Sequence, residues 1–217
     1  MTILEALQSF HRQYEGNTDY PDSSSEDFVT RLEKANGAIG QWEKKLFEGI
    51  FWKELFTPHI AVTTTDSQSD AAENFLFPGS SLYIGSIEYK FCRPELARKK
   101  IKEDQNARIF WVTGTSGAYK ININPAPGIG VAIEYDYYRK ALRFDGSEST
   151  QIEMSDPEFV VHWMLAQIFT DDENTTQAGL QMDLANEKMQ SMQLANEMTP
   201  FYQDDTVDLS DNRGFGI

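Results

Sequence analysis

The sequence predicts an α+β fold in which a helical bundle domain carries an inserted small antiparallel β region and an extended C-terminal tail. Three observations lead to this prediction. Apolar residues recur at steps of three and four near both ends of the chain, β-branched and aromatic residues alternate in the middle, and the last residues are acidic with isolated apolar groups. We therefore expect a helical domain over residues 1–58 and 153–198, a β-rich region over 59–152 and a tail over 199–217.

The clearest helix start is Ser155-Asp156-Pro157-Glu158. Asp or Ser suits an N-cap, proline suits the first helical position because it has no N–H to lose, and an acid in the first turn faces the positive end of the helix dipole. Apolar residues follow at helical spacing to Ile168. After a polar cluster over residues 171–176, a second helix is expected from Thr176 to Met198.

Apolar residues of this second helix fall on more than one side, and Met182–Glu187 is echoed ten residues later by Met192–Glu197. Ten residues do not close a whole number of helical turns, so the two copies point in different directions. Such a helix lies in a core or touches a neighbouring subunit. We predict contact with a neighbour through Leu184, Met189 and Met192.

At the N-terminal end, helical spacing from Ile3 to Tyr14 predicts a first amphipathic helix. A second helical stretch from Phe28 to Phe51 is weakened in the middle by Gly37 and Gly40, so it forms either one helix or two, and it is expected to end at Pro58.

The middle of the chain predicts strands at Ile60–Thr64, Ser81–Tyr89, Arg108–Thr113, Ala118–Ile123 and Gly130–Tyr138. Gly114-Thr115-Ser116-Gly117 is typical of a hairpin loop, and Asn124–Gly128 of a turn. A short basic helix is expected at Pro94–Lys102, between two of the strands.

Composition limits the function. The formal net charge of −15 disfavours binding to free nucleic acid, which depends on basic residues displacing phosphate counterions, but it suits a surface past which DNA slides. The single cysteine, Cys92, predicts a buried or inert thiol in a reducing compartment. No run of apolar residues reaches the length of a membrane span, so we expect no membrane association.

The motifs that suggest chemistry are weak. Gly114–Lys120 lacks the residue order of a phosphate-binding loop. His11, His59 and His162 are scattered, and the acidic run Asp171–Asn174 lacks the register of a calcium loop. We therefore predict no catalytic residue, no metal and no cofactor.

Two features favour interactions with other chains. Basic residues concentrate around Arg98, Lys99, Lys100 and Lys102, which indicates either a solvated helix or a surface that docks on an acidic neighbour. The tail either stays free or fits a partner, and its isolated apolar residues are the candidate anchors: Phe201, Tyr202, Val207, Leu209, Phe215 and Ile217.

The order of these elements resembles the head-to-tail connector adaptor (neck) proteins of tailed bacteriophages. The resemblance rests on Trp42 and Trp52 before the β region, Phe77–Tyr83, Ile121–Gly128 running into Val131–Lys140, and Ile152–Phe159 opening the late helix. These are degenerate patterns spread over most of the chain, not a catalytic signature.

The resemblance implies a structural, non-enzymatic virion protein made in the host cytoplasm. It implies a homo-oligomeric ring, usually twelvefold, that binds the portal protein through the C-terminal segment. The ring would extend the channel for genomic double-stranded DNA during packaging and ejection, without sequence-specific binding, and dock the tail or next neck protein below. The alternatives are a stopper, tail-completion or tail-wall protein, and, from another class, a soluble enzyme using His162 and scattered carboxylates.

Overall fold

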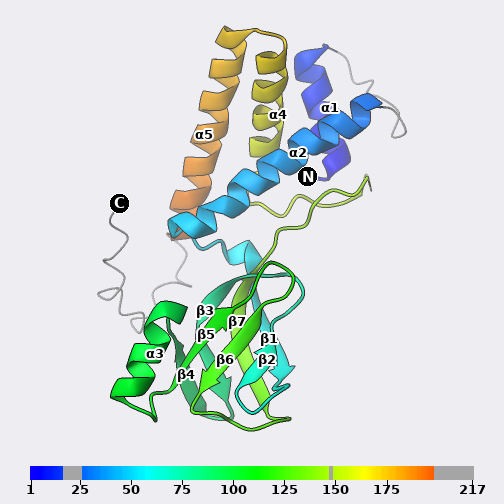
Figure 1. The fold of residues 1–217 in the computed structure, drawn as a ribbon. Helices are drawn as coiled ribbons and strands as arrows, with labels where there is room; N and C mark the ends of the chain where they lie inside the picture. Colours follow the sequence, from blue (N-terminus) through cyan, green and yellow to red (C-terminus); the bar gives the residue numbers. More distant parts are fainter. Residues whose placement is uncertain (17–25, 147–148, 198–217) are drawn as a thin grey trace. The chain divides into compact units, whose positions relative to one another are not determined.

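The computed structural model describes residues 1–16, 26–146 and 149–197, and its chain divides into two compact units (Figure 1). The helical unit comprises Met1–Glu54 and the described residues from Ala141 onwards, and the β unit comprises Leu55–Lys140.

The described residues of the helical unit form four helices and a short 3-10 turn. They are α1 (Ile3–Tyr14), α2 (Glu26–Lys44), η1 (Lys45–Glu48), α4 (Glu158–Asp171) and α5 (Thr175–Glu197). A second 3-10 turn, η2 (Lys53–Leu55), leads to the β unit. Helix α1 begins with a capping box, because the Thr2 side chain accepts from the Glu5 N–H while the Glu5 carboxylate accepts from the Thr2 N–H.

Helix α4 is the centre of the helical unit, because it packs against α1, α2 and α5 (Figure 1). Its residues are buried on most of its circumference, as the dense apolar run from Phe159 to Ala166 requires. The predicted helix start is confirmed to within one residue: α4 begins at Glu158, and Pro157 takes the N-cap position instead of the first helical position. The Asp156 carboxylate accepts from the Glu158 N–H at 3.2 Å. Lys188 of α5 adds ion pairs to Glu158 (2.5 Å) and Asp156 (3.3 Å).

The segment that leaves the β unit is tied to α2. The Glu43 carboxylate accepts from the Ala141 N–H at 2.8 Å. Asn36 accepts from the Phe144 N–H at 2.8 Å and donates to its carbonyl at 3.0 Å. These bonds satisfy backbone groups of residues 141–144, which lie in no strand or helix.

The β unit is one seven-stranded sheet in the order β1-β7-β3-β4-β5-β6-β2. The strands are β1 (Phe56–Val62), β2 (Gln68–Asp70), β3 (Phe75–Ile84), β4 (Ile87–Phe91), β5 (Ile109–Thr113), β6 (Lys120–Asn124) and β7 (Ala132–Arg139). All pairs are antiparallel except β4 and β5, which are parallel and joined by helix α3 (Pro94–Glu103).

The two edges of the sheet approach each other, so that the sheet is a nearly closed barrel. A bridge joins Thr63 to Ser69, and the Ser69 hydroxyl donates to the Val62 carbonyl at 3.0 Å. The interior is filled from most of the strands by side chains that include Leu82, Phe110, Ile121, Ile133 and Tyr135. Closure therefore gives the β unit a core of its own and leaves few unpaired strand edges.

The predicted fold class is wrong in its β part. A small antiparallel β region was expected, whereas the structure has a seven-stranded mixed sheet. The expected strand Ser81–Tyr89 is two strands, because Gly85 adopts a positive φ of 59° and turns the chain between β3 and β4. Strand β2 was missed because Gln68-Ser69-Asp70 has no apolar residue. Strand β1 begins earlier than the expected Ile60, so that Pro58 lies inside it.

Pro58 is compatible with β1 because this strand pairs continuously only with β7, so the missing N–H costs no ladder bond on a second side. The hairpin loop predicted at Gly114–Gly117 is confirmed between β5 and β6. The basic helix predicted between two strands is confirmed as α3.

Trp52 is the side chain on which we expect the helical unit to depend most. Its indole N–H donates to the Trp42 carbonyl at 2.8 Å, the two rings lie 5.6 Å apart, and Trp52 is 1% exposed. Trp52→Ala should lower the free energy of unfolding by about 3–5 kcal/mol, measured by urea denaturation, because a large cavity and an unpaired carbonyl remain. Trp52→Phe should cost clearly less; equal losses would contradict this assignment.

His11 makes the stability of the helical unit depend on pH. It is 1% exposed and hydrogen-bonded to Arg31, with Glu15 at 3.4 Å. Burial, followed by the charge of Arg31, lowers the pKa of His11 below its ordinary value of 6.5, and Glu15 only partly opposes this. As the pH falls below 6.5, the unfolded chain therefore binds a proton that the folded chain does not, and stability is lost.

We expect His11→Gln to flatten the loss of stability between pH 7 and pH 5.5, by at most about 1.4 kcal/mol per pH unit. Urea denaturation at several pH values measures this slope. Burial alone would raise the pKa of Glu15, but the hydrogen bond from Arg31 and the charge of Arg31 lower it, so the contribution of Glu15 to stability is lost only below about pH 4.5. A variant with the same slope as the wild type would contradict the role of His11.

Candidate functional site

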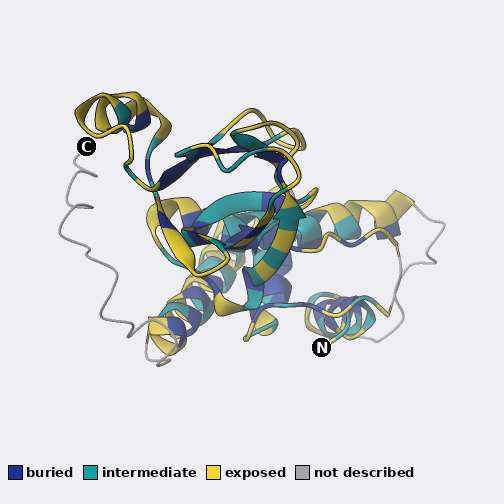
Figure 2. Cartoon of the chain, turned by 90° about the horizontal axis from the view of Figure 1, so that it is seen from below, coloured by how far each residue is buried: buried dark blue, intermediate teal, exposed yellow. Residues whose placement is uncertain are grey.

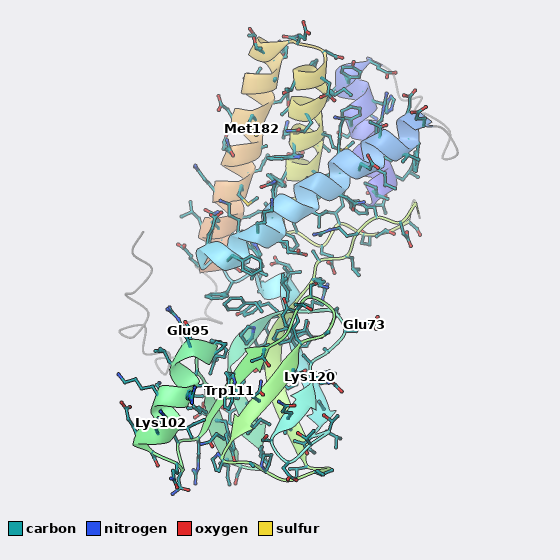
Figure 3. All side chains as sticks on the ribbon, in the orientation of Figure 1. Glu73, Glu95, Lys102, Trp111, Lys120 and Met182 are labelled. Carbon is teal, nitrogen blue, oxygen red and sulfur yellow. The ribbon has the colours of Figure 1, made fainter. Side chains whose placement is uncertain are left out.

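Helix α3 has one side that packs on the sheet. Pro94 opens the helix, and Ala97 (buried) and Ile101 (half-buried) lie against Cys92, Ile109 and Trp111. Residues Ile109 and Trp111 alternate along β5 with the inward-facing Phe110, so α3 covers the outer surface of this strand. Figure 3 labels Trp111 on the strand and Lys102 on the helix.

The buried thiol predicted for Cys92 is confirmed. Cys92 is 3% exposed beneath α3, and burial raises the pKa of its thiol despite the charge of Lys100. Its sulfur lies 3.5 Å from the Arg93 carbonyl, to which it donates. A neutral, covered thiol is a poor nucleophile, so Cys92 acts as a small core residue.

The other side of α3 is exposed, as the yellow colour in Figure 2 shows, and it carries basic residues. The predicted contact residues Arg98, Lys99, Lys100 and Lys102 all lie there. Among the described residues, the only ion pair of these four joins Lys99 to Glu103 at 3.9 Å, and both side chains are more than half exposed. Such a pair contributes little. The basic side of α3 is thus free for a partner.

The local charge of α3 differs from that of the whole chain. Residues 93–108 hold six basic and three acidic side chains, while the chain carries a formal net charge of −15. Leu96, 44% exposed, adds an apolar group to this surface. A basic helix on an acidic protein attracts acidic surfaces, including those of other copies.

A second surface, which the sequence analysis did not single out, lies on the outer face of β1, β7 and β3. Ile60, Val62 and Tyr83 point outwards there and are 67%, 53% and 40% exposed. The register aligns Ile60 with Glu134 on β7, and Glu134 with Tyr83 on β3. One row across three strands therefore alternates apolar, acidic and aromatic groups.

Carboxylates make this outer face acidic. Glu134 and Asp136 lie on the same face of β7, and neither side chain has a hydrogen-bond or ion-pair partner within the described part of the chain. Burial raises the pKa of Asp136. Pro58, Tyr83 and both carboxylates border a hollow of about 430 Å³. A cation brought into this hollow would therefore meet two uncompensated acids.

A neighbouring hollow of about 530 Å³ lies beside His59, Asn74 and Tyr137. Its aromatic groups, and Tyr135 of the first hollow, already have partners. The Tyr137 hydroxyl donates to Asn74 at 2.6 Å, Tyr135 accepts from the Ala72 N–H at 3.1 Å, and His59 packs edge-on against both tyrosines. Burial raises the pKa of Tyr135 to about 12, so this hydroxyl stays protonated. These contacts brace the barrel wall.

Helix α5 places the other predicted contact residues differently. Met189 and Met192 are buried at 6% and 2% exposure inside the helical unit, and Leu184 is half-buried. The two methionines therefore pack within their own chain, which the apolar pattern alone could not decide. Leu180 and Leu194 are instead exposed, at 52% and 60%. At 100° per residue, both lie roughly opposite the buried side of α5.

The remaining motifs have structural surroundings. His162 of α4 hydrogen-bonds Gln181 of α5 at 2.8 Å. In the acidic turn between α4 and α5, Asp172 accepts from the Tyr14 hydroxyl and Asp171 pairs with Lys34. Across the described ranges, no three His, Cys, Asp or Glu side chains gather as metal ligands do. Nor does any described helix have the length and apolar character of a membrane span.

The six predicted tail anchors from Phe201 to Ile217 lie outside the described residues. Their role stays a prediction. No protein-family model matches this chain, and no curated protein matches it either.

The acidic face depends on a close approach at Gly79. Between Pro78 and Leu82 the pairing of β3 with β7 shifts register, and a Cβ atom on Gly79 would lie 2.5 Å from the Asp136 carbonyl oxygen. Gly79→Ala should therefore displace β7 and lower the free energy of unfolding by about 1–3 kcal/mol in urea denaturation.

Gly179→Ala is the matched control for this substitution. Gly179 lies on an exposed part of α5, and an added Cβ would meet nothing within 4 Å. It should stabilise the chain by about 0.5–1 kcal/mol through helix propensity. A Gly79→Ala chain as stable as the wild type would contradict the close approach.

Proposed function

We propose that this chain is a structural virion protein, a head-to-tail adaptor of a tailed bacteriophage that forms a ring beneath the portal. The ring extends the channel through which genomic double-stranded DNA passes and docks the tail or next neck protein. The resemblance of the sequence to this family supports the proposal. An adaptor acts through surfaces that contact its partners, and not through an enclosed reactive centre.

The exposed ridge of α5 is the observation that carries this proposal. Leu180 and Leu194 stand on the side of the helix opposite its buried residues, three to four turns apart. Asp183 and Glu187 lie between them on the same side and are exposed. A ridge of two leucines and two acids fits a weak lateral contact between copies, which forms only when many copies are held side by side.

Charge supports the conduit role. A formal net charge of −15 on each copy makes a ring strongly acidic. Acidic walls repel the phosphate backbone, so DNA passing through such a channel is not retained. The basic residues of α3 then bind protein partners instead of DNA.

The stopper, tail-completion and tail-wall alternatives differ in position along the particle axis. They predict association with a component below the ring and indifference to the portal. Measuring the mass of the purified chain alone and after mixing with portal rings from the same particle separates these roles. An adaptor joins the portal in a fixed stoichiometry.

We expect deletion of residues 201–217 to abolish attachment to portal rings. The deleted segment contains all six predicted anchors, whereas the helical and β units have their own cores. Mass measurement of the mixture detects attachment, and far-UV circular dichroism checks that the fold is retained.

A chain with Leu180→Glu and Leu194→Glu is the matched control. It keeps the tail, so it should still bind the portal, but with fewer copies than the wild type because the lateral contact is weakened. Unchanged attachment of the truncated chain would remove the tail from the portal contact. A wild-type chain that ignores portal rings would overturn the adaptor role.

A further inference from the structure

The cationic and acidic surfaces of the β unit lie on opposite sides of its barrel. Helix α3 covers β5, next to β4. In the strand order, β1 is three strands from β4 by way of β7 and β3, and three strands from β5 by way of β2 and β6. In a nearly closed barrel, the outer face of β1 therefore points away from α3, and α3 cannot reach that face of its own chain.

The exposed side of α3 has a simple layout. Leu96 lies three and four residues before Lys99 and Lys100, so both lysines flank it on the helix surface, about 5–6 Å away. All three side chains are exposed. The side of α3 thus presents one apolar group beside two ammonium groups.

The outer face of the barrel has the complementary layout. Ile60 lies directly beside Glu134 on the neighbouring strand, about 5 Å away, and Tyr83 lies on the far side of Glu134. Asp136 is two residues from Glu134 along β7, a separation of about 7 Å. Apolar and acidic groups are therefore spaced on this face as apolar and basic groups are spaced on α3.

We propose that α3 of one copy docks on the outer β1–β7–β3 face of the next copy, with Leu96 against Ile60 and Tyr83. Lys99 and Lys100 then enter the hollow bordered by Glu134 and Asp136. The inference rests on the proposed ring and names a contact between its β units. Because the two surfaces differ and lie on opposite sides, the contact is heterologous, the kind that builds rings when the rotation closes.

Charge favours a second copy as the occupant. Each copy supplies the acidic face and the basic helix in equal number, so every contact in a closed ring is satisfied. The weak exposed pair between Lys99 and Glu103 is easily given up. The two carboxylates of the hollow gain the partners that they lack within the described chain.

Disulfide trapping between two differently tagged full-length chains tests this contact. One chain carries Leu96→Cys and the other Ile60→Cys, while Cys92 is buried and does not compete. We expect mixed dimers to form on oxidation, both with and without portal rings, and no dimers from either chain alone. The matched control replaces Ile60→Cys by Val29→Cys, an exposed residue of α2 at 49%. Cross-linking that is no faster than this control, in both settings, overturns the proposal.

Charge exchange tests the pairing. Lys99→Glu with Lys100→Glu in the Leu96→Cys chain should lower the trapped fraction about fivefold, and Glu134→Lys with Asp136→Lys in the Ile60→Cys chain should do the same. Combining both changed chains should restore it, and raised salt should weaken the wild-type contact. No restoration would show that these groups do not meet.

Failure of this contact and failure of the adaptor role give different results. A chain that attaches to portal rings without the cross-link keeps the adaptor role and loses this interface. A chain that cross-links but ignores portal rings keeps the interface and loses the adaptor role.

Discussion

The alternation of side chains along β7 is the constraint on which the β unit depends. This strand pairs with β1 on one side and β3 on the other, so neither edge is free and both faces are fixed. Ile133, Tyr135 and Tyr137 face inwards and fill the barrel, while Glu134 and Asp136 face outwards. A slip of one residue would bury the acids and expose the tyrosines, so the core and the acidic face are set together.

The close approach at Gly79 follows from the same arrangement. The register shift between Pro78 and Leu82 lets β3 bend around β7, and only a residue without a side chain can pass the Asp136 backbone so closely. The Phe77–Tyr83 segment, a feature of the family resemblance, thus has a local physical reason. It shapes the wall of the barrel that carries the acidic face.

The sequence predicted the elements whose apolar spacing or turn residues indicate their structure locally. The periodic runs that became α1 and α4 and the Gly114–Gly117 hairpin loop were recognised. Strand β2 was not, because its partners are polar: Gln68 donates to Asn122 of β6 at 2.8 Å, and Ser69 closes the barrel through its hydroxyl. Closure of the barrel depends on residues that are far apart in the sequence, so no local pattern at Gln68–Asp70 predicts it.

The two candidate surfaces also differ in how far the sequence predicts them. The basic side of α3 could be predicted because its basic residues are close together in the sequence. The acidic face was not, because Ile60, Tyr83 and Glu134 are far apart in sequence and meet only through strand register. Periodicity placed apolar groups on several sides of α5 but could not tell that Met189 and Met192 turn inwards while Leu180 and Leu194 turn outwards. That choice depends on where α4 packs.

The weak contacts that we propose for the two units fit assembly on a template. An exposed apolar group and two ion pairs supply only a few kcal/mol, less than association of free proteins costs, so a single contact between copies is short-lived. Holding many copies at one site converts each further contact into an intramolecular step, and small gains would then accumulate around the proposed ring. A strongly acidic chain with the basic helix α3 suits this scheme, because mutual repulsion keeps free copies apart while α3 specifies which surface is met in the proposed ring.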